Sequence, residues 1–156
     1  MYETAVLLHN IRSAHNVGSI FRTADGAGIG KLYLSGYSPQ PIDQFGRPQP
    51  HIKKTALGAE KNIPWEYQKN PYAIIAALGE SGWQIVGVEQ DTRSIDYRSF
   101  TLKKPTLFVL GNEVLGMSPA LRKKCDTLLE IPMHGKKESL NVSVAAGIIL
   151  FSISTK

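Results

Sequence analysis

The sequence contains a single cysteine, Cys125, among its 156 residues. No intramolecular disulfide can form, and such sparse use of cysteine favours a reducing, cytoplasmic setting. No apolar run approaches the roughly 20 residues that are needed to span a bilayer. The chain begins Met1-Tyr2-Glu3-Thr4, without the basic and then apolar stretch of a secretory leader. These absences lead us to expect a cytoplasmic protein without a membrane segment.

Two common phosphate-binding motifs are also missing. After the first apolar run the chain reads NIRSAHNVG, without the Gly-x-Gly-x-x-Gly that lets a dinucleotide approach a helix N-terminus. No Gly-x-x-x-x-Gly-Lys-Ser/Thr loop occurs either. Classical nucleotide binding, including that of a small reductase, is therefore disfavoured.

The sequence gives little support for metal or hydrolase chemistry. The histidines show no paired spacing of the kind found in metal sites, and Cys125 has no partner cysteine. No Gly-x-Ser-x-Gly segment marks a hydrolase nucleophile. We therefore expect no metal centre.

The charge balance points to a class of partner without establishing one. The chain carries 18 Lys and Arg against 13 Asp and Glu, a formal net charge of +5. A basic protein favours a polyanionic partner, although many basic proteins merely carry solvated lysines. The length fits one domain, which buries roughly two-thirds of its unfolded surface.

Short apolar runs rich in β-forming residues alternate with helical patterns along the chain. Helices are predicted from Ser13 or Asn16 to the glycines at 28–30, in part of 52–61 and directly after Ser118. This alternation predicts an α/β fold with three layers around a mostly parallel sheet. The predicted strands cover 4–10, 31–37, 84–90, 106–112 and 127–133, and two further helices cover 71–81 and 141–154.

Polar residues and glycines follow three of the predicted strands. They are Glu89-Gln90, Gly111-Asn112-Glu113 and Met133-His134-Gly135. In a parallel α/β sheet, ligands bind beyond the carboxyl ends of the strands. We therefore expect a binding site there. The long irregular stretch at 38–50, which holds four prolines, is a second segment of functional interest.

Three segments stand out, although each has an ordinary structural explanation. The segment Asn16-Val17-Gly18-Ser19-Ile20-Phe21-Arg22 could present an exposed arginine paired with Asp25 or Asp91. GNEVLG at 111–116 could be a turn in which glycine supplies unusual backbone angles. Within 131–143, Ser139, Asn141 and Ser143 could simply cap a helix.

Taken together, the three segments resemble the motifs of the SpoU/TrmH family of RNA 2′-O-methyltransferases, within the SPOUT group. The matching patterns are Asn-x-Gly-x-x-x-Arg at 16–22, Gly-x-Glu-x-x-Gly at 111–116, and Ile-Pro-Met…Ser-Leu-Asn-Val-Ser at 131–143. KTALGAE at 54–60 is similar to the TrmH-like branch. The resemblance extends over about residues 4–152.

The resemblance implies a fold and a cofactor. In the family the C-terminal segment is threaded through a loop, which makes a deep trefoil knot, a rare topology. The knot binds S-adenosylmethionine in a bent shape, between apolar walls with a few directed polar groups. The residues expected to contact this cofactor are Val88, Glu89, Leu110, Gly111, Ile131, Met133, Ser139 and Leu140.

The resemblance also implies catalytic residues. The family's counterpart of Arg22 acts on the ribose 2′-hydroxyl, and its role as a base stays open. A guanidinium has a pKa above about 12 and no acceptor, so a phosphate clamp that stabilises negative charge is the more conservative hypothesis. Asn16 and Asn141 would orient Arg22 or the ribose, and Glu113 would pair with Arg22 or position a loop. Ser139 completes the candidate set.

The implied partner is RNA, either tRNA or rRNA, which would approach over basic residues that contact phosphates. Family members are typically homodimers, and we expect the first and last helices to form the interface. We expect residues 1–156 to form a single catalytic domain without a separate RNA-binding extension. The alternative is a catalytically inactive RNA-binding module with the same fold. The predicted RNA contacts are Arg12, His15, Lys53, Lys54 and Lys61.

Overall fold

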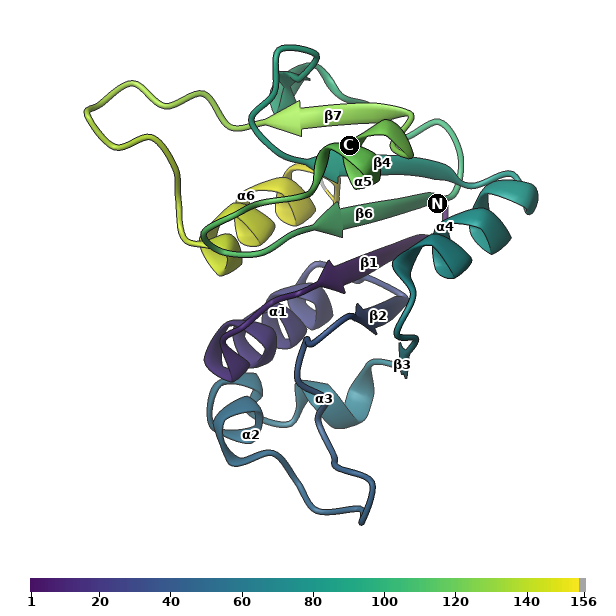
Figure 1. Ribbon diagram of the computed structural model, residues 1–156, viewed down its shortest axis with the longest axis vertical. Coiled ribbons are helices and arrows are strands. Elements are labelled where there is room, and N and C mark those ends of the chain that lie inside the picture. Colours follow the sequence, from purple (N-terminus) through teal and green to yellow (C-terminus); the bar gives the residue numbers. More distant parts are fainter. Residues whose placement is uncertain (155–156) are drawn as a thin grey trace.

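The computed structural model describes residues 1–154, which form a seven-stranded sheet flanked by helices (Figure 1). Every neighbouring pair of strands is parallel, in the spatial order β3-β2-β1-β6-β4-β7-β5. All carboxyl ends of the strands therefore lie at one edge of the sheet. The strands are β1 (Thr4–His9), β2 (Lys31–Ser35), β3 (Trp65–Tyr67), β4 (Gln84–Val88), β5 (Ile95–Asp96), β6 (Thr106–Leu110) and β7 (Thr127–Glu130).

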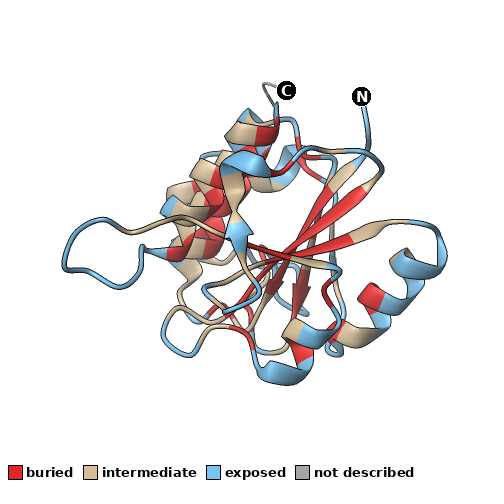
Figure 2. Ribbon diagram, turned by 90° about the horizontal axis from the view of Figure 1, so that it is seen from above, coloured by how far each residue is buried: buried red, intermediate tan, exposed pale blue. Residues whose placement is uncertain are grey.

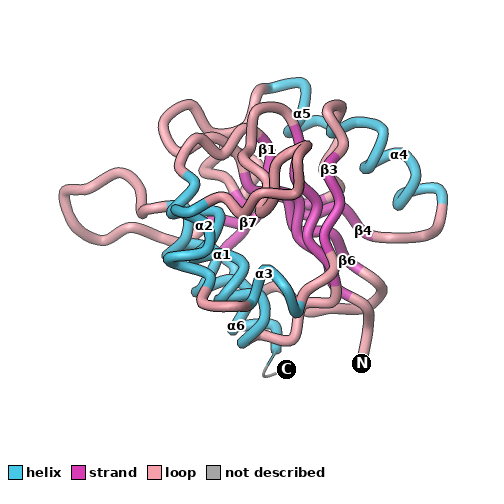
Figure 3. Tube along the Cα trace, turned by 90° about the horizontal axis from the view of Figure 1, so that it is seen from below, coloured by secondary structure: helices cyan, strands magenta, loops and turns pink. Residues whose placement is uncertain are grey.

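Helices cover both faces of this sheet. Seen along the sheet in Figure 3, α1, α2, α3 and α6 lie on one side of the strands, and α4 and α5 lie on the other. This arrangement gives the three layers that the alternating pattern predicted. The helices are α1 (Ala14–Gly26), α2 (Pro50–Ala56), α3 (Ala59–Asn62), α4 (Pro71–Glu80), α5 (Pro119–Lys123) and α6 (Val142–Ser154), and a short 3₁₀ helix covers Tyr97–Ser99.

Two hydrophobic cores form because successive side chains of a strand point to opposite faces. Along β1, Val6 and Leu8 belong to the core beneath α1 and α6, whereas Ala5 and Leu7 belong to the core beneath α4 and α5. All four are fully buried, and Figure 2 shows that burial concentrates in the central strands. Strands buried on both faces explain the continuous apolar runs.

The predicted strands and helices are present, and their boundaries differ where the backbone leaves the sheet. All five predicted strands end one to three residues earlier than predicted. For β1 and β2 the reason is the backbone, because Asn10 adopts φ 55° and Gly36 adopts φ 62°. The predicted helix at 52–61 is two helices, interrupted by positive φ values at Leu57 and Gly58. Strands β3 and β5 were missed, because three and two residues carry no periodicity.

None of the helices within residues 1–154 is long and apolar enough to cross a membrane.

The contact between α1 and α2 depends on the small size of Gly18. A Cβ at this position would lie 2.0 Å from Thr55 Oγ1 and 2.5 Å from the Ile52 carbonyl oxygen. The Thr55 hydroxyl donates a hydrogen bond of 2.9 Å to the His15 carbonyl, which joins the two helices. Gly18 therefore sets how closely α2, with its lysines, approaches the first motif.

We predict that Gly18→Ala lowers the free energy of unfolding by about 1–3 kcal/mol, because overpacking displaces the backbone of α2. Gly147→Ala is the matched control: its new Cβ would meet only Thr23 Cγ2, at 3.8 Å. This control should be neutral or stabilising by up to about 1 kcal/mol. Urea denaturation at equal protein concentration measures both, and equal effects would contradict this account of the contact.

Candidate functional site

A pocket of about 160 Å³ lies at the carboxyl ends of β4, β6 and β7. Its walls come from the residues that end or follow these strands and from the segment leading into α6. We call it the strand-end pocket. Its lining comprises Val88, Glu89, Gln90, Leu110, Gly111, Asn112, Glu113, Val114, Gly116, Leu129, Glu130, Ile131, Met133, Ser139, Leu140, Val142 and Ala145.

All eight residues that the sequence analysis assigned to cofactor contact line this one pocket. They come from three segments that are far apart in the sequence, at 88–89, 110–111 and 131–140. The sheet brings them together because β4 pairs with both β6 and β7. Leu110, Leu129 and Val142 are among the apolar residues that line the pocket, and Glu89, Glu113 and Glu130 are its acidic ones.

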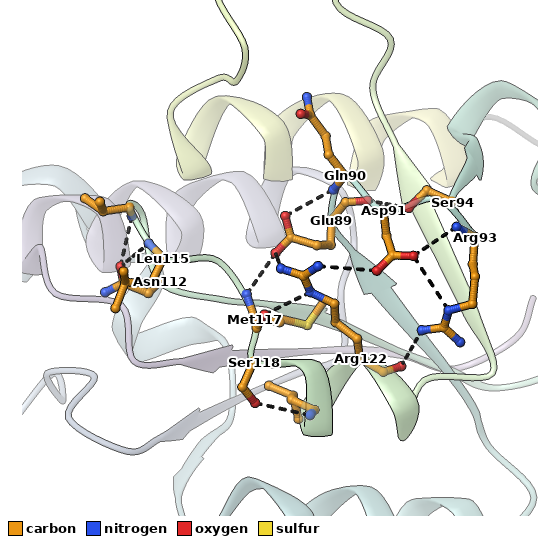
Figure 4. A network of polar contacts seen from close by, with 12 residues as sticks. Glu89, Gln90, Asp91, Arg93, Ser94, Asn112, Leu115, Met117, Ser118 and Arg122 are labelled. Carbon is orange, nitrogen blue, oxygen red and sulfur yellow. Dashed lines mark hydrogen bonds and ion pairs between the residues drawn. The ribbon is translucent and has the colours of Figure 1, made fainter.

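Glu89 fastens the second motif to the end of β4 (Figure 4). Its carboxylate accepts hydrogen bonds from the Met117 amide, at 2.8 Å, and from the Gln90 amide, at 3.1 Å. The Arg122 guanidinium lies 3.9 Å from the same carboxylate and donates to Asp91, at 3.3 Å. These contacts fix the loop after β6 over the neighbouring strand.

Two glycines of the second motif are required by close packing. Gly116 has φ 65°, and a Cβ there would lie 2.3 Å from Glu89 Oε2. A Cβ on Gly111 would lie 2.8 Å from the Met117 amide nitrogen and from the carbonyl carbon of Gly116. The glycines thus let residues 111–117 fold back tightly, which the turn interpretation anticipated.

A chain of hydrogen bonds joins all three motifs. Asn16 donates from Nδ2 to Glu113 Oε1, at 3.2 Å, and accepts at Oδ1 from Asn141 Nδ2, also at 3.2 Å. Asn141 in turn accepts from the Ser143 amide, at 2.8 Å, at the start of α6. One residue of each motif therefore takes part in a single network beside the strand-end pocket.

The Glu113 carboxylate also holds the start of α1. It accepts from the backbone amides of Arg12, at 2.9 Å, and Ser13, at 3.0 Å, one on each carboxylate oxygen. Ser13 caps α1 by accepting from the Asn16 amide. An anion at a helix N-terminus is favourable. Partial burial raises the pKa of Glu113, but the backbone amides and Asn16 outweigh it and hold this pKa below its ordinary value of 4.5.

Arg22 lies apart from this network. It is exposed on α1, six residues beyond Asn16 and therefore about 9 Å further along the helix axis. It lines another cavity, the Arg22 cavity, with Ser19, Lys54, Thr55 and Phe151 among its neighbours. Within residues 1–154 it forms no salt bridge, so the pairing with Asp25 or Asp91 is absent. Glu113 positions a loop and does not pair with Arg22.

The remaining predicted residues are divided between the sites. Ser139 lines the strand-end pocket, together with Glu113. Of the predicted RNA contacts, Lys54 lines the Arg22 cavity and Arg12 lines a further cavity next to Glu113. The ring of His15 packs against that of His51, with centroids 4.6 Å apart. Lys53 and Lys61 are exposed on α2 and α3.

Sequence reasoning gave no role to three residues at the site, which are Gln90, Asn112 and Tyr37. Gln90 donates from Nε2 to the Glu138 carbonyl, at 2.7 Å, and so ties β4 to the third motif. Asn112 accepts at Oδ1 from the amides of Val114 and Leu115, which shapes the second motif. Asn112 also donates to the hydroxyl of Tyr37, at 2.9 Å. The available signal was their position directly after a parallel strand.

No group of three or more His, Cys, Asp or Glu within residues 1–154 is arranged to hold a metal ion.

Comparison with known proteins agrees with this geometry. The model of the SpoU rRNA methylase family matches residues 3–151, nearly the whole chain. The chain belongs to the SpoU rRNA methylase family. All three motifs fall within the matched residues.

Relatives with assigned activities include two enzymes that act on different RNAs. The chain is 35% identical over 146 residues to the tRNA (guanosine(18)-2′-O)-methyltransferase of Aquifex aeolicus, covering 94% of this chain and 66% of that protein. It is also 35% identical over 146 residues to the 23S rRNA (guanosine-2′-O-)-methyltransferase RlmB of Pseudomonas aeruginosa, covering 94% and 56%. This SpoU chain thus spans less than two-thirds of the length of either relative.

Solved structures of SpoU proteins superpose on most of the chain. The A. aeolicus TrmH/SpoU tRNA modifying enzyme gives a TM-score of 0.85 at 31% identity, covering 99% of this chain and 75% of that one. The S-adenosylmethionine-bound rRNA methyltransferase of Sinorhizobium meliloti gives 0.86 at 32% identity, covering 96% and 55%. The parallel α/β sheet with its helices is therefore the fold of this family.

We predict that Glu113→Gln lowers stability by about 1–3 kcal/mol at pH 7. Glutamine keeps one acceptor oxygen, so at least one of the three N–H donors on Glu113 loses its acceptor and the remaining hydrogen bonds become neutral. The lowered pKa of Glu113 means that its contribution is complete above its ordinary pKa and disappears as pH falls through the folded-state value. The difference between wild type and variant should therefore shrink below about pH 4.5.

Urea denaturation between pH 3 and pH 8 (on the order of ten conditions) checks this pH dependence. Glu80→Gln, an exposed carboxylate on α4, is the matched control and should leave stability unchanged. A constant difference between wild type and Glu113→Gln across this range would contradict the role of the Glu113 charge.

Proposed function

We propose that this chain transfers a methyl group from S-adenosylmethionine to a ribose 2′-hydroxyl of tRNA or rRNA, in the cytoplasm. The observation that carries the proposal is the network from Glu113 through Asn16 to Asn141. It joins the three family motifs beside a pocket that all eight expected cofactor contacts line. Membership in the SpoU family and the names of both relatives support it.

The strand-end pocket fits S-adenosylmethionine in its chemistry. Leu110, Leu129 and Val142 suit an adenine ring, and three carboxylates suit a ligand with a sulfonium and an ammonium group. The volume of 160 Å³ is below the roughly 300 Å³ at which small-molecule sites begin. The adjoining segment 134–141 is exposed, lies outside helices and strands, and is held at Glu138 and Asn141 by hydrogen bonds to Gln90 and Asn16. We propose that the part of it between these two contacts shifts outward as the ligand enters.

When bound, the cofactor supplies an electrophilic methyl group on a sulfonium ion. The protein then has to place the 2′-hydroxyl in line, so that an oxygen–carbon bond forms as the carbon–sulfur bond breaks and the hydroxyl proton leaves. The apolar walls of the pocket exclude water from the methyl group. Asn16 and Asn141 hold the first and third motifs at its edge.

Arg22 serves as a phosphate clamp and stabiliser of negative charge. Its guanidinium donates hydrogen bonds but has no acceptor for the hydroxyl proton. Lys54 lines the same cavity, so two cations converge on one surface of α1 and α2. Such a pair suits the RNA phosphate beside the target ribose. Arg12, His15, Lys53 and Lys61 extend the phosphate-contacting surface.

The position of Arg22 leads us to include a homodimer in the proposal. Arg22 does not line the strand-end pocket of its own chain. The outer face of α6 exposes Val144 and Phe151, at 49% and 47%, which favours an interface through α1 and α6. A second copy packed there would complete the site with its own Arg22. We also propose that the segment from the second motif to α6 forms the trefoil knot of the family.

We predict that Arg22→Ala lowers the rate of methyl transfer at least about 100-fold, because the phosphate clamp and the transition-state charge stabilisation are both lost. Cofactor affinity should stay unchanged, because Arg22 does not line the strand-end pocket of its own chain. Tritiated methyl transfer to unmodified tRNA and rRNA, with calorimetry for S-adenosylmethionine, measures both. Arg22→Lys keeps the positive charge but removes the planar guanidinium, which can donate two parallel hydrogen bonds. Full activity of this variant would show that bidentate contact is not needed. Wild-type protein that binds RNA without transferring methyl would favour the inactive RNA-binding module.

Co-expression of two inactive variants tests whether Arg22 acts across the dimer. Ala145→Phe adds a ring to the wall of the strand-end pocket and leaves Arg22 intact. When Ala145→Phe and Arg22→Ala are expressed together, half of the dimers contain one subunit of each variant. If Arg22 acts on its partner, each mixed dimer has one complete site, made of the pocket of the Arg22→Ala subunit and the Arg22 of the Ala145→Phe subunit. Recovery of about a quarter of wild-type activity is expected. No recovery from purified mixed dimers would contradict action across the interface.

A further inference from the structure

We infer that Tyr37 is a stacking surface for a nucleobase of the substrate RNA, and this inference rests on the proposed function. Tyr37 follows β2 and lines a cavity with Arg12, Asn16, Glu113 and Leu115 among its neighbours, which we call the Tyr37 cavity. The Tyr37 cavity adjoins the strand-end pocket, because Asn112, Glu113 and Val114 line both. A nucleotide that approaches the strand-end pocket across this shared wall passes beside the ring of Tyr37.

The ring of Tyr37 is held in place yet remains open to solvent. Its hydroxyl accepts from Asn112 Nδ2, at 2.9 Å, and its amide donates to Asn10 Oδ1, at 3.1 Å. The preceding Gly36 is fixed by the Tyr67 hydroxyl, which donates to its carbonyl at 2.7 Å. Nevertheless Tyr37 is 57% exposed.

A rigid aromatic side chain with a free surface is suited to stacking. Little conformational entropy is lost when a ligand meets a group that is already ordered. Every nucleobase offers a π-face, so such a contact tolerates different bases. Val114 and Leu115, exposed at 89% and 79%, add apolar surface beside the same cavity.

Arg12 supplies the matching charge. Its side chain is exposed and forms no salt bridge within residues 1–154, while its backbone is fixed by Glu113. An aromatic surface beside a cation at one cavity matches the pattern of single-stranded RNA sites, where bases stack and phosphates pair with arginine. The occupant that fits is an unstacked nucleotide whose ribose lies toward the wall shared with the strand-end pocket.

The experiment compares two labelled single-stranded RNAs of equal length, one carrying all four bases and one in which every nucleotide is abasic. Tyr37→Ala should weaken binding of the first about tenfold, the loss expected for one base stack, and leave binding of the abasic RNA unchanged. Tyr37→Phe keeps the ring and should bind both like wild type. Tyr2→Ala, an exposed tyrosine before β1, is the matched control and should change neither.

Arg12→Ala provides the complementary readout. It should weaken binding of both RNAs and reduce the salt dependence of affinity by about 0.7 in log–log slope, whereas Tyr37→Ala should leave that slope unchanged. Calorimetry with S-adenosylmethionine shows whether each variant keeps an intact strand-end pocket.

Three results would overturn the inference. The first is that Tyr37→Ala binds base-bearing RNA like wild type. The second is that Tyr37→Phe binds as weakly as Tyr37→Ala, which would assign the effect to the hydrogen bond with Asn112. The third is that Tyr37→Ala disrupts a dimer instead of RNA binding. The proposed function survives each of these if wild-type protein still transfers methyl to RNA. A wild-type protein that binds no RNA would overturn both.

Discussion

The site depends on the hydrogen bonds that the Glu113 carboxylate accepts from the start of α1. Glu113 lies three residues after the central strand β6, and its two carboxylate oxygens accept hydrogen bonds from the backbone amides that precede α1. Because α1 begins after the neighbouring strand β1, this contact joins the segments that follow two adjacent strands. Asn16 extends the contact to Asn141 and hence to α6. Removing the charge would loosen all three motifs together.

The parallel sheet explains why such distant segments meet. Strand order β1-β6-β4-β7 places the three motif-bearing segments and β4 side by side at one edge. Glycines 111 and 116 then let the loop after β6 pack directly on Glu89. The remaining space at the strand ends is the strand-end pocket, and the Tyr37 cavity shares Asn112, Glu113 and Val114 with it. The Arg22 cavity lies apart, against α1, α2 and α6. The strand order thus sets the strand-end pocket and the Tyr37 cavity beside it.

Much of this arrangement could be predicted from sequence, for physical reasons. Buried parallel strands are continuous apolar runs, so β1, β4, β6 and β7 were recognisable, and the residues after them marked the pocket. The catalytic interpretation of Arg22 required the family resemblance, since its helix position alone fits a surface arginine. The position of Gln90 at the expected site was recognised, but the contacts of Gln90 and Tyr37 were missed because their partners lie 48 and 75 residues away. No local pattern encodes such contacts.

The central claim, methylation of a ribose, is tested most directly by locating the transferred group. Unmodified tRNA and rRNA are incubated with wild-type protein and S-adenosylmethionine tritiated in its methyl group, and the product is digested with alkali. Alkaline cleavage requires a free 2′-hydroxyl, so a label on the ribose is predicted to appear in an alkali-resistant dinucleotide. A label found on a base, or no transfer by protein that binds both ligands, would contradict the account.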